Sequence, residues 1–121
     1  KNKHYLYEVI KMKKYFLYRH TFPNGKVYIG ITSRSNPELR WLNGRGYKTQ
    51  TLMYEAIKHY GWENIKHEIL FYDVPESEIN ELERKIIAEH RANEPEFGYN
   101  ILEGGLGDYS HPGQAVLMYD L

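Results

Sequence analysis

Several residues of this chain have side chains suited to phosphodiester chemistry. Glu83 lies within an amphipathic segment, where a carboxylate needs a metal ion, a cation or hydrogen-bond donors to offset its burial. Arg40 has a guanidinium that donates two parallel hydrogen bonds to phosphate and stays charged. Tyr18, His20 and Tyr28 carry phenols and an imidazole, which can relay a proton or hold a water molecule. As a set, these groups suit phosphodiester hydrolysis with a single divalent metal ion.

Each of these residues also has a simpler interpretation. Glu83 could reach solvent from the edge of its apolar stripe, or pair with Lys85 or Arg91. A single Arg in a basic helix is most often a surface residue, and aromatic side chains on a hairpin stabilise it by cross-strand packing. Asn100 follows Gly98-Tyr99, where a side-chain amide more often caps a turn than holds a catalytic carboxylate. The six histidines lack metal-ligand spacing, which argues against a His-based zinc site.

The composition narrows the class of protein. The chain has 121 residues, enough for one domain with its own core, and it has no Cys. A thiolate nucleophile, a Cys-based zinc site and an iron–sulfur cluster are therefore excluded. Residues 1–66 hold 13 Lys+Arg and 4 Asp+Glu, whereas residues 67–121 hold 3 and 12. The basic first half favours a polyanionic partner, unless the two halves only neutralise each other.

The strongest local signal is a β-hairpin at residues 15–32. Two β-branched and aromatic runs flank Pro23-Asn24-Gly25, which suits a three-residue loop with Gly25 in a left-handed conformation. This loop predicts that Tyr18 pairs with Gly30, which has no side chain and leaves space for the ring. A two-residue turn at Asn24-Gly25 would instead pair Tyr18 with Ile31. The three-residue loop places four residues on one face: Tyr18, His20, Tyr28 and Gly30.

The remaining pattern predicts an α+β fold, a small three-stranded antiparallel sheet flanked by helices. We expect a short helix at 37–42, a flexible basic loop at 43–46, a helix at 49–60, a strand at 65–71 and a helix at 76–91. In the last helix, Glu83 follows Ile79 by four positions and precedes Ile87 by four, so it lies in the apolar stripe or at its edge.

At this point the residues resemble a known family, the GIY-YIG nucleases. Tyr28-Ile29-Gly30 follows Tyr18 by ten residues within FLYRHTFPNGKVYIGITS, which is similar to the family signature. The resemblance extends to Arg40-Trp41, to AIKHYGWENIKHEIL, to Glu83 in ELERKII and to Gly98-Tyr99-Asn100. It covers roughly residues 15–105. The YIG triplet alone is a weak signal, but the ordered set of Tyr, Tyr, Arg, Glu and Asn at these separations is specific.

The resemblance implies a DNA endonuclease site. Glu83 matches the Glu that binds one Mg²⁺ or Mn²⁺ ion, and Arg40 matches the Arg that contacts the scissile phosphate. Tyr18 and Tyr28 match the tyrosines that position or deprotonate the attacking water, and Asn100 matches an Asn near the carboxylate. We further expect a substrate-binding set around these catalytic residues: His20, Gly30, Trp41, Arg45 and Lys48.

The chain also departs from the family pattern. Its first triplet is Phe16-Leu17-Tyr18 instead of Gly-Ile-Tyr, although the Tyr is kept. Some members have a His after the Arg helix, where this chain has Leu42-Asn43-Gly44, and another family His falls near Tyr47-Lys48. Lys48 and His20 are the candidates to replace those groups. We expect six basic residues to gather around the Tyr18 face: Arg19, Lys26, Arg34, Arg40, Arg45 and Lys48.

These observations predict one nuclease domain with two extensions. We expect a basic extension at 1–14, the domain at 15–105 and a tail at 106–121. Residues 115–121 resemble the opening of a DNA-binding repeat, which suggests a domain cut from a homing-type or mobile-element endonuclease; a stand-alone domain with an ordinary tail is the alternative. No membrane-spanning run or signal-peptide core is evident, so we expect an intracellular protein of a bacterium or phage. The competing functions are a nucleic-acid-binding module without cleavage and an aromatic-rich interaction domain.

Overall fold

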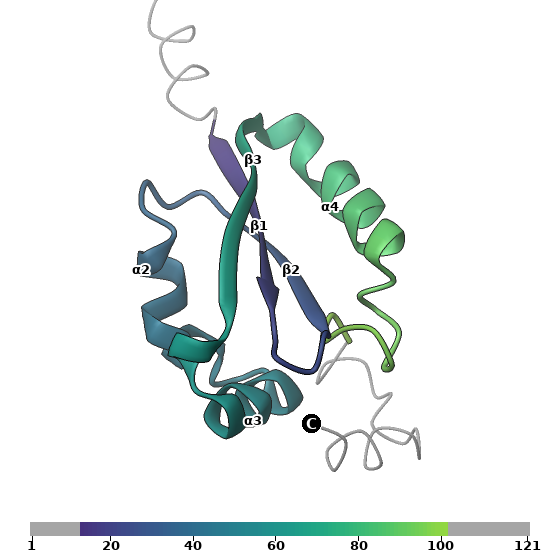
Figure 1. Cartoon of the computed structure of the whole chain (residues 1–121). Helices are drawn as coiled ribbons and strands as arrows, with labels where there is room; N and C mark the ends of the chain where they lie inside the picture. Colours follow the sequence, from purple (N-terminus) through teal and green to yellow (C-terminus); the bar gives the residue numbers. More distant parts are fainter. Residues whose placement is uncertain (1–12, 102–121) are drawn as a thin grey trace, which may run out of the picture.

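The computed structural model describes residues 13–101 and shows an α+β fold (Figure 1). Three strands, β1 (Lys14–Thr21), β2 (Val27–Thr32) and β3 (Lys66–Pro75), form an antiparallel sheet in the order β2-β1-β3. Helices lie on both sides of this sheet in Figure 1. The predicted fold class is therefore confirmed.

The β1–β2 hairpin has the predicted register. Tyr18 pairs with Gly30 and His20 with Tyr28. The Phe22 N–H donates to the Lys26 carbonyl at 2.9 Å across a loop of three residues. Gly25 in that loop has φ +91°, which glycine adopts without steric cost, and the Asn24 side chain accepts from the Lys26 N–H at 2.9 Å. Local turn chemistry thus places both signature tyrosines on one face of the sheet.

The connection from β2 to β3 is helical. It contains α2 (Glu38–Trp41), the 3-10 turn η1 (Leu42–Tyr47), α3 (Thr51–Tyr60) and the 3-10 turn η2 (Trp62–Asn64). The predicted break at residues 43–46 exists, but the predicted flexible loop is instead a turn packed against the core. Gly44 has φ +94°, and a Cβ there would lie 2.8 Å from Ile57 and 3.1 Å from Trp62. Close packing of α3 and η2 on this turn therefore requires glycine.

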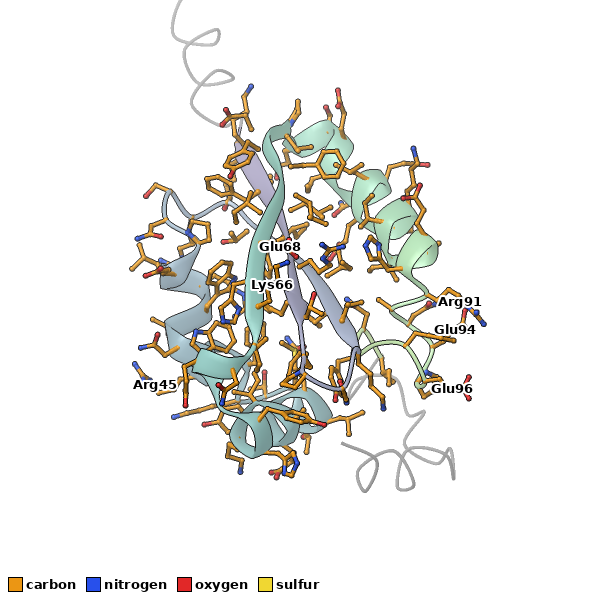
Figure 2. The ribbon with its side chains drawn as sticks, viewed as in Figure 1. Arg45, Lys66, Glu68, Arg91, Glu94 and Glu96 are labelled. Atoms are coloured by element: carbon orange, nitrogen blue, oxygen red, sulfur yellow. The ribbon has the colours of Figure 1, made fainter. Side chains whose placement is uncertain are left out.

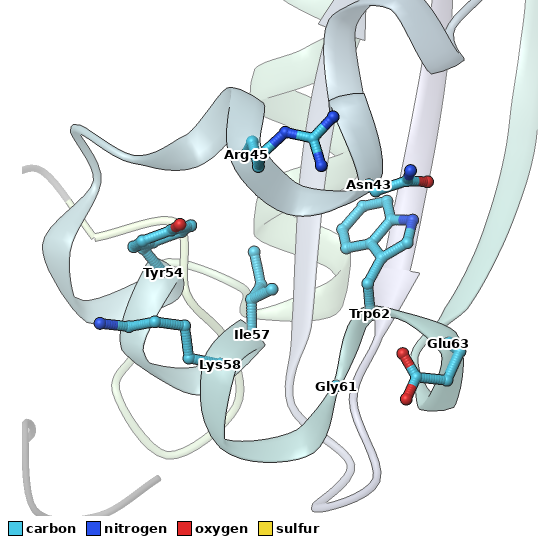
Figure 3. A pocket seen from close by; sticks show the side chains of 8 residues that line it. All are labelled: Asn43, Arg45, Tyr54, Ile57, Lys58, Gly61, Trp62 and Glu63. Carbon is cyan, nitrogen blue, oxygen red and sulfur yellow. The ribbon is translucent and has the colours of Figure 1, made fainter.

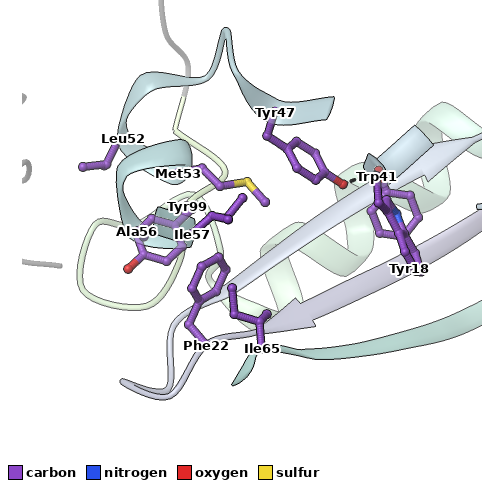
Figure 4. Close-up of a cluster of buried hydrophobic side chains, with 10 residues drawn as sticks. All are labelled: Tyr18, Phe22, Trp41, Tyr47, Leu52, Met53, Ala56, Ile57, Ile65 and Tyr99. Atoms are coloured by element: carbon purple, nitrogen blue, oxygen red, sulfur yellow. Dashed lines mark hydrogen bonds between the residues drawn. The ribbon is translucent and has the colours of Figure 1, made fainter. Parts of the chain in front are cut away.

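Two separate cores lie on the two faces of the sheet. Tyr18 and Phe22 face α2, η1 and α3, where they pack with residues such as Trp41, Tyr47 and Met53 (Figure 4). The opposite face is aliphatic and packs against α4 (Glu76–His90). Its buried members are Leu17, Ile29, Val74, Ile79, Ile86 and Ala92. The α4 stripe predicted from periodicity is confirmed, with Glu83 half-buried at its edge.

Strand β3 runs further than its predicted end at Phe71. It continues to Pro75 through Asp73, which has φ +53°, and irregular pairing between β1 and β3 accommodates the change of register. Asp-Val-Pro resembles a turn in sequence, yet Val74 is buried between the sheet and α4, and this burial favours continued pairing. The expected extension at 1–14 lies outside the described residues up to position 12, and Lys14 begins β1. The expected tail at 106–121 lies wholly outside them.

Candidate active site

Tyr18 is the centre of the aromatic face. Its side chain is almost fully buried, and its ring lies over Gly30, where a Cβ would come within 2.5 Å of the ring. The predicted space beside Tyr18 is therefore confirmed: Gly30 serves the site by its lack of a side chain. Burial raises the pKa of the Tyr18 phenol, so this group is neutral at physiological pH.

A buried hydrogen-bond chain connects Tyr18 to the far edge of the sheet. The Tyr18 and Tyr47 hydroxyls lie 2.9 Å apart, and the Tyr47 hydroxyl lies 2.9 Å from His20 Nε2. His20 Nδ1 lies 2.9 Å from His67 Nδ1, and His67 Nε2 lies 3.2 Å from the Trp62 carbonyl oxygen. Figure 4 shows the Tyr47 hydroxyl directed toward Tyr18. We refer to these five groups as the buried hydrogen-bond chain.

His20 is a member of this chain and does not face a substrate. Its side chain is 0% exposed and is enclosed by the rings of Tyr47, Trp62 and His67. Burial, followed by the field of His67, lowers the pKa of His20 well below its ordinary value. The expected direct contact with substrate is thus incompatible with this structure, because the aromatic core covers the imidazole.

Arg40 is held in place by the turn that follows α2. Its Nη1 donates to the Gly46 carbonyl at 2.7 Å, and its guanidinium lies 4.5 Å from the centre of the Tyr47 ring. A Cβ on Gly46 would overlap the Arg40 carbonyl, so this turn also requires glycine. One bond to a carbonyl leaves other guanidinium N–H groups for a phosphate.

Glu83 lies on α4, the helix that packs against the opposite, aliphatic face of the sheet. Burial raises the pKa of its carboxyl, and the neighbouring Arg84 offsets this only in part. Among residues 13–101, no hydrogen bond or ion pair satisfies this carboxylate. Its field also raises the pKa of Tyr18 and Tyr28, while that of Arg40 lowers both. Arg40 and Glu83 therefore both lie near enough to the two tyrosines to influence the pKa of their phenols.

Asn100 is fully engaged with strand β2. Its Oδ1 accepts from the Ile29 N–H at 2.7 Å, and its Nδ2 donates to the Ile29 carbonyl at 2.7 Å. Val27 likewise exchanges backbone hydrogen bonds with the segment around Gly98. The observed contacts of Asn100 therefore fasten the segment after α4 to the edge of β2. They involve no carboxylate side chain.

The expected substrate-binding residues lie at different depths. Trp41 is buried and its Nε1 has no well-formed hydrogen bond within the described part of the chain, although its proximity to Tyr18 lowers the pKa of that phenol. Arg45 and Lys48 are exposed. Arg45 lines a pocket of ≈ 490 Å³ between η1, α3 and η2, together with Asn43, Tyr54, Ile57, Lys58, Gly61, Trp62 and Glu63 (Figure 3).

The expected gathering of six basic residues is wrong in part. Arg19 lies on the opposite face, because side chains alternate along a strand, and it donates to Glu68 at 2.7 Å and contacts His90 at 3.0 Å. Lys26 is buried, with its ammonium 5.6 Å from the centre of the Tyr99 ring. In Figure 2, Arg45 projects from the side of the molecule opposite to Glu94 and Glu96.

Two members of the site were not predicted from the sequence. Tyr47 follows a glycine-rich turn, and no periodic signal indicates that its ring is 0% exposed. His67 could have been found, because it alternates with Ile65 and Ile69 along the expected strand and thus shares their face. Pairing of His67 with His20 places the two imidazoles together.

Comparisons with known proteins identify the family of the chain. The GIY-YIG catalytic domain family matches residues 14–100 of the chain. A protein of enterobacteria phage T4, named "Putative endonuclease segB", is 35% identical over 98 residues. That match covers 80% of this chain and 42% of the phage protein, so the chain spans less than half of that relative's length. No solved structure matches the chain.

The antiparallel sheet carries both signature tyrosines on its aromatic face, which is consistent with the nuclease family that matches the chain. The chain belongs to the GIY-YIG catalytic domain family. No helix within residues 13–101 combines the length and apolar character needed to cross a membrane.

Proposed function

We propose that this chain is a divalent-metal-dependent DNA endonuclease domain, part of a homing-type or mobile-element nuclease. The observation that carries the proposal is the match of residues 14–100 to the GIY-YIG catalytic domain family, and the influence of Arg40 and Glu83 on the pKa of both signature tyrosines supports it. The resemblance of the chain to a phage protein named as an endonuclease supports DNA as the substrate.

Each residue has a role that follows from its contacts. Arg40, held by the Gly46 carbonyl, binds the scissile phosphate through its remaining N–H groups. Tyr18 holds the attacking water, since its oxygen accepts hydrogen bonds while its ring is fixed over Gly30. Tyr28 borders the same site, and its neutral phenol donates a hydrogen bond to a phosphate oxygen. Asn100 positions β2 through Ile29.

Glu83 fits a metal ligand. A half-buried carboxylate with a raised pKa and no ion-pair partner in the described region is costly unless a cation binds it. Mg²⁺ and Mn²⁺ are commonly bound by one or two carboxylates, with water and substrate phosphate oxygens completing the octahedron. Bound there, one such ion would stabilise negative charge on the phosphate and the leaving oxygen.

We expect the domain to contact the DNA backbone on both sides of the reacting phosphate. Arg45 and Lys48 are exposed on the turn that holds Arg40, and they would contact the DNA backbone on either side. Such contacts position the duplex and do not read its sequence. Selection of a cleavage site is therefore assigned to parts of the larger protein, consistent with the fraction of the relative that the chain spans.

Incubation of the full chain with supercoiled plasmid tests the proposal. We expect nicked and linear DNA with Mg²⁺ or Mn²⁺, no product with EDTA, and no product from Arg40→Ala at any metal concentration. The control Lys58→Ala removes an exposed cation from α3 and should cleave normally. Salt-sensitive DNA binding without nicking would show a binding module instead, and absence of DNA binding would show an interaction domain.

A further inference from the structure

The buried hydrogen-bond chain has a direction that its last acceptor determines. The Trp62 carbonyl can only accept, so His67 Nε2 carries a proton. Burial lowers the pKa of His67 and the ring is therefore neutral near pH 7, which leaves Nδ1 as an acceptor. His20 must then donate through Nδ1 and accept at Nε2 from the Tyr47 hydroxyl.

The same logic continues to the reacting end of the chain. The Tyr18 and Tyr47 hydroxyls lie 2.9 Å apart, a distance that suits either of them as donor. Because Tyr47 has a single proton and that proton is directed to His20, Tyr18 is the donor in this pair. Each of the four side chains thus donates toward the Trp62 carbonyl in the resting state. The opposite direction, in which Tyr47 donates to Tyr18, requires one more proton on His20 or His67, and burial lowers the pKa of both imidazoles.

This direction addresses a chemical difficulty of the site. The Tyr18 phenol is neutral, and a neutral phenol is a very weak base toward a water molecule. It can accept a proton only if its own proton leaves at the same time. The chain supplies that exit, since each successive acceptor lies within 2.9 Å.

We propose that the buried hydrogen-bond chain transfers the proton of the attacking water from Tyr18 to His67, which is the terminal proton acceptor of the reaction. This inference rests on the proposed function. The water oxygen forms the new bond to phosphorus as the bond to the leaving oxygen breaks. The water proton passes to Tyr18, the Tyr18 proton to Tyr47, the Tyr47 proton to His20 Nε2, and the His20 Nδ1 proton to His67 Nδ1.

The surroundings of His67 allow it to hold and then release this proton. Its ring stacks on Trp62 with centroids 3.9 Å apart, and the Trp62 carbonyl and the Glu38 carboxylate of α2 both raise its pKa against the larger effect of burial. His20 is the other titratable group that faces it, from β1, and the field of Arg40 acts on His20. The His67 side chain is only half-buried, so solvent can take the proton, and the leaving oxygen is protonated from solvent.

The first test is the pH dependence of single-turnover cleavage by the full chain with Mg²⁺. In the wild type, we expect the rate to level off above the pKa of His67, because neutral His67 accepts the proton. In His67→Gln, we expect a rate about 100-fold lower near pH 7 that keeps rising toward pH 9, because hydroxide must come from solvent. DNA affinity measured with Ca²⁺ should not change.

Two further variants separate a relay from a packing effect. His59→Gln alters an exposed histidine of α3 that takes no part in the chain, and its rate should match the wild type. Tyr47→Phe keeps the ring but removes the link between Tyr18 and His20. We therefore expect the double variant Tyr47→Phe/His67→Gln to be no slower than Tyr47→Phe alone, whereas independent packing defects would add.

A measurement without cleavage keeps the inference testable on its own. Long-range ¹H–¹⁵N NMR of the wild type near pH 7 should show His67 as the Nε2–H tautomer and His20 as the Nδ1–H tautomer. The reverse tautomers, or a wild-type pH profile in His67→Gln, would overturn the relay while leaving the proposed function intact. A wild type that never nicks DNA overturns the proposed function itself.

Discussion

The two faces of the sheet are both buried, but their side chains differ in chemistry. Toward α4, the buried residues are aliphatic, for example Leu17, Ile29 and Ile79. Toward α2, η1 and α3, the face is aromatic and carries hydroxyl and imidazole groups, including Tyr18 and His20. An aliphatic core is satisfied by contact alone, whereas each buried polar atom needs a hydrogen-bond partner.

This difference indicates that the aromatic face depends on hydrogen bonding as well as on packing. A core of phenols and imidazoles is stable only when the groups are connected, and the buried hydrogen-bond chain provides that connection. Trp41 Nε1 is the one buried side-chain polar atom without a partner among the described residues, and it lies beside Tyr18. The aromatic face thus combines a connected network with an indole N–H that lies beside Tyr18 at the proposed reaction centre.

The largest effect on cleavage is expected from a change at Glu83. This residue lies on the helix that packs against the aliphatic face, but its charge influences Tyr18 and Tyr28 of the aromatic face. Glu83→Gln should reduce plasmid nicking to background, because a neutral amide of the same shape cannot supply the charge that a hard divalent cation needs. DNA binding should persist. Glu89→Gln, an exposed residue on the same helix, is the matched control and should cleave normally.

The same variant has a stability signature. The folded-state pKa of Glu83 is raised, so its ionised form is penalised by the fold and Glu83→Gln should unfold at a higher temperature near pH 7. This advantage should shrink as the pH falls through the raised pKa toward the ordinary one, because the wild-type carboxyl then becomes protonated. An unchanged cleavage rate in this variant would remove Glu83 from the site.

The second prediction compares one deletion on each face. Leu17→Ala should lower the free energy of unfolding by about 2–5 kcal/mol through a cavity in the aliphatic core, yet cleavage per folded molecule should stay normal. Tyr47→Phe should cost about 1–3 kcal/mol, because it leaves His20 Nε2 without its donor, and it should also slow cleavage. Chemical unfolding measures the free energy of unfolding, and single-turnover experiments measure the cleavage rate. Equal losses of rate in the two variants would contradict the view that only the aromatic face takes part in cleavage.

The third prediction compares two glycines in one hairpin. Gly30→Ala should cost about 1–3 kcal/mol and impair cleavage, because the new Cβ displaces the Tyr18 ring. Gly25→Ala should cost about 1–2 kcal/mol through its positive φ, but the space around it is open and the rate per folded molecule should be kept. Retained activity in Gly30→Ala would show that the exact position of Tyr18 does not matter.

The smallest effect is expected from the ion pair on the α4 side. Arg19→Met should change the free energy of unfolding by less than about 1 kcal/mol, because Arg19 and Glu68 are partly exposed and screened. Arg19 holds the pKa of Glu68 below its ordinary value, so this contribution is present above that ordinary pKa and disappears as the pH falls through the lowered one. Unfolding at pH 7 and pH 3 measures the difference; a large loss of cleavage would place Arg19 in the site after all.

Local sequence signals were sufficient for the hairpin and for the position of Glu83. The Pro23-Asn24-Gly25 loop determines the register, because an odd loop with a left-handed glycine permits only the pairing of Tyr18 with Gly30. The α4 periodicity likewise determines that Glu83 lies at the stripe edge, since neighbours three and four positions away define one helix face. Both features depend on residues close together in the chain.

The contacts between distant segments were decided by tertiary structure alone. His67 meets His20 across 47 positions, Asn100 meets Ile29 across 71, and Arg19 meets Glu68 across 49. No local sequence pattern indicates which distant residue each of them contacts, because each pairing depends on how the sheet and helices pack as a whole. Burial of Tyr47 has the same origin: the turn that carries it is ordered by close packing of Gly44 against α3 and η2.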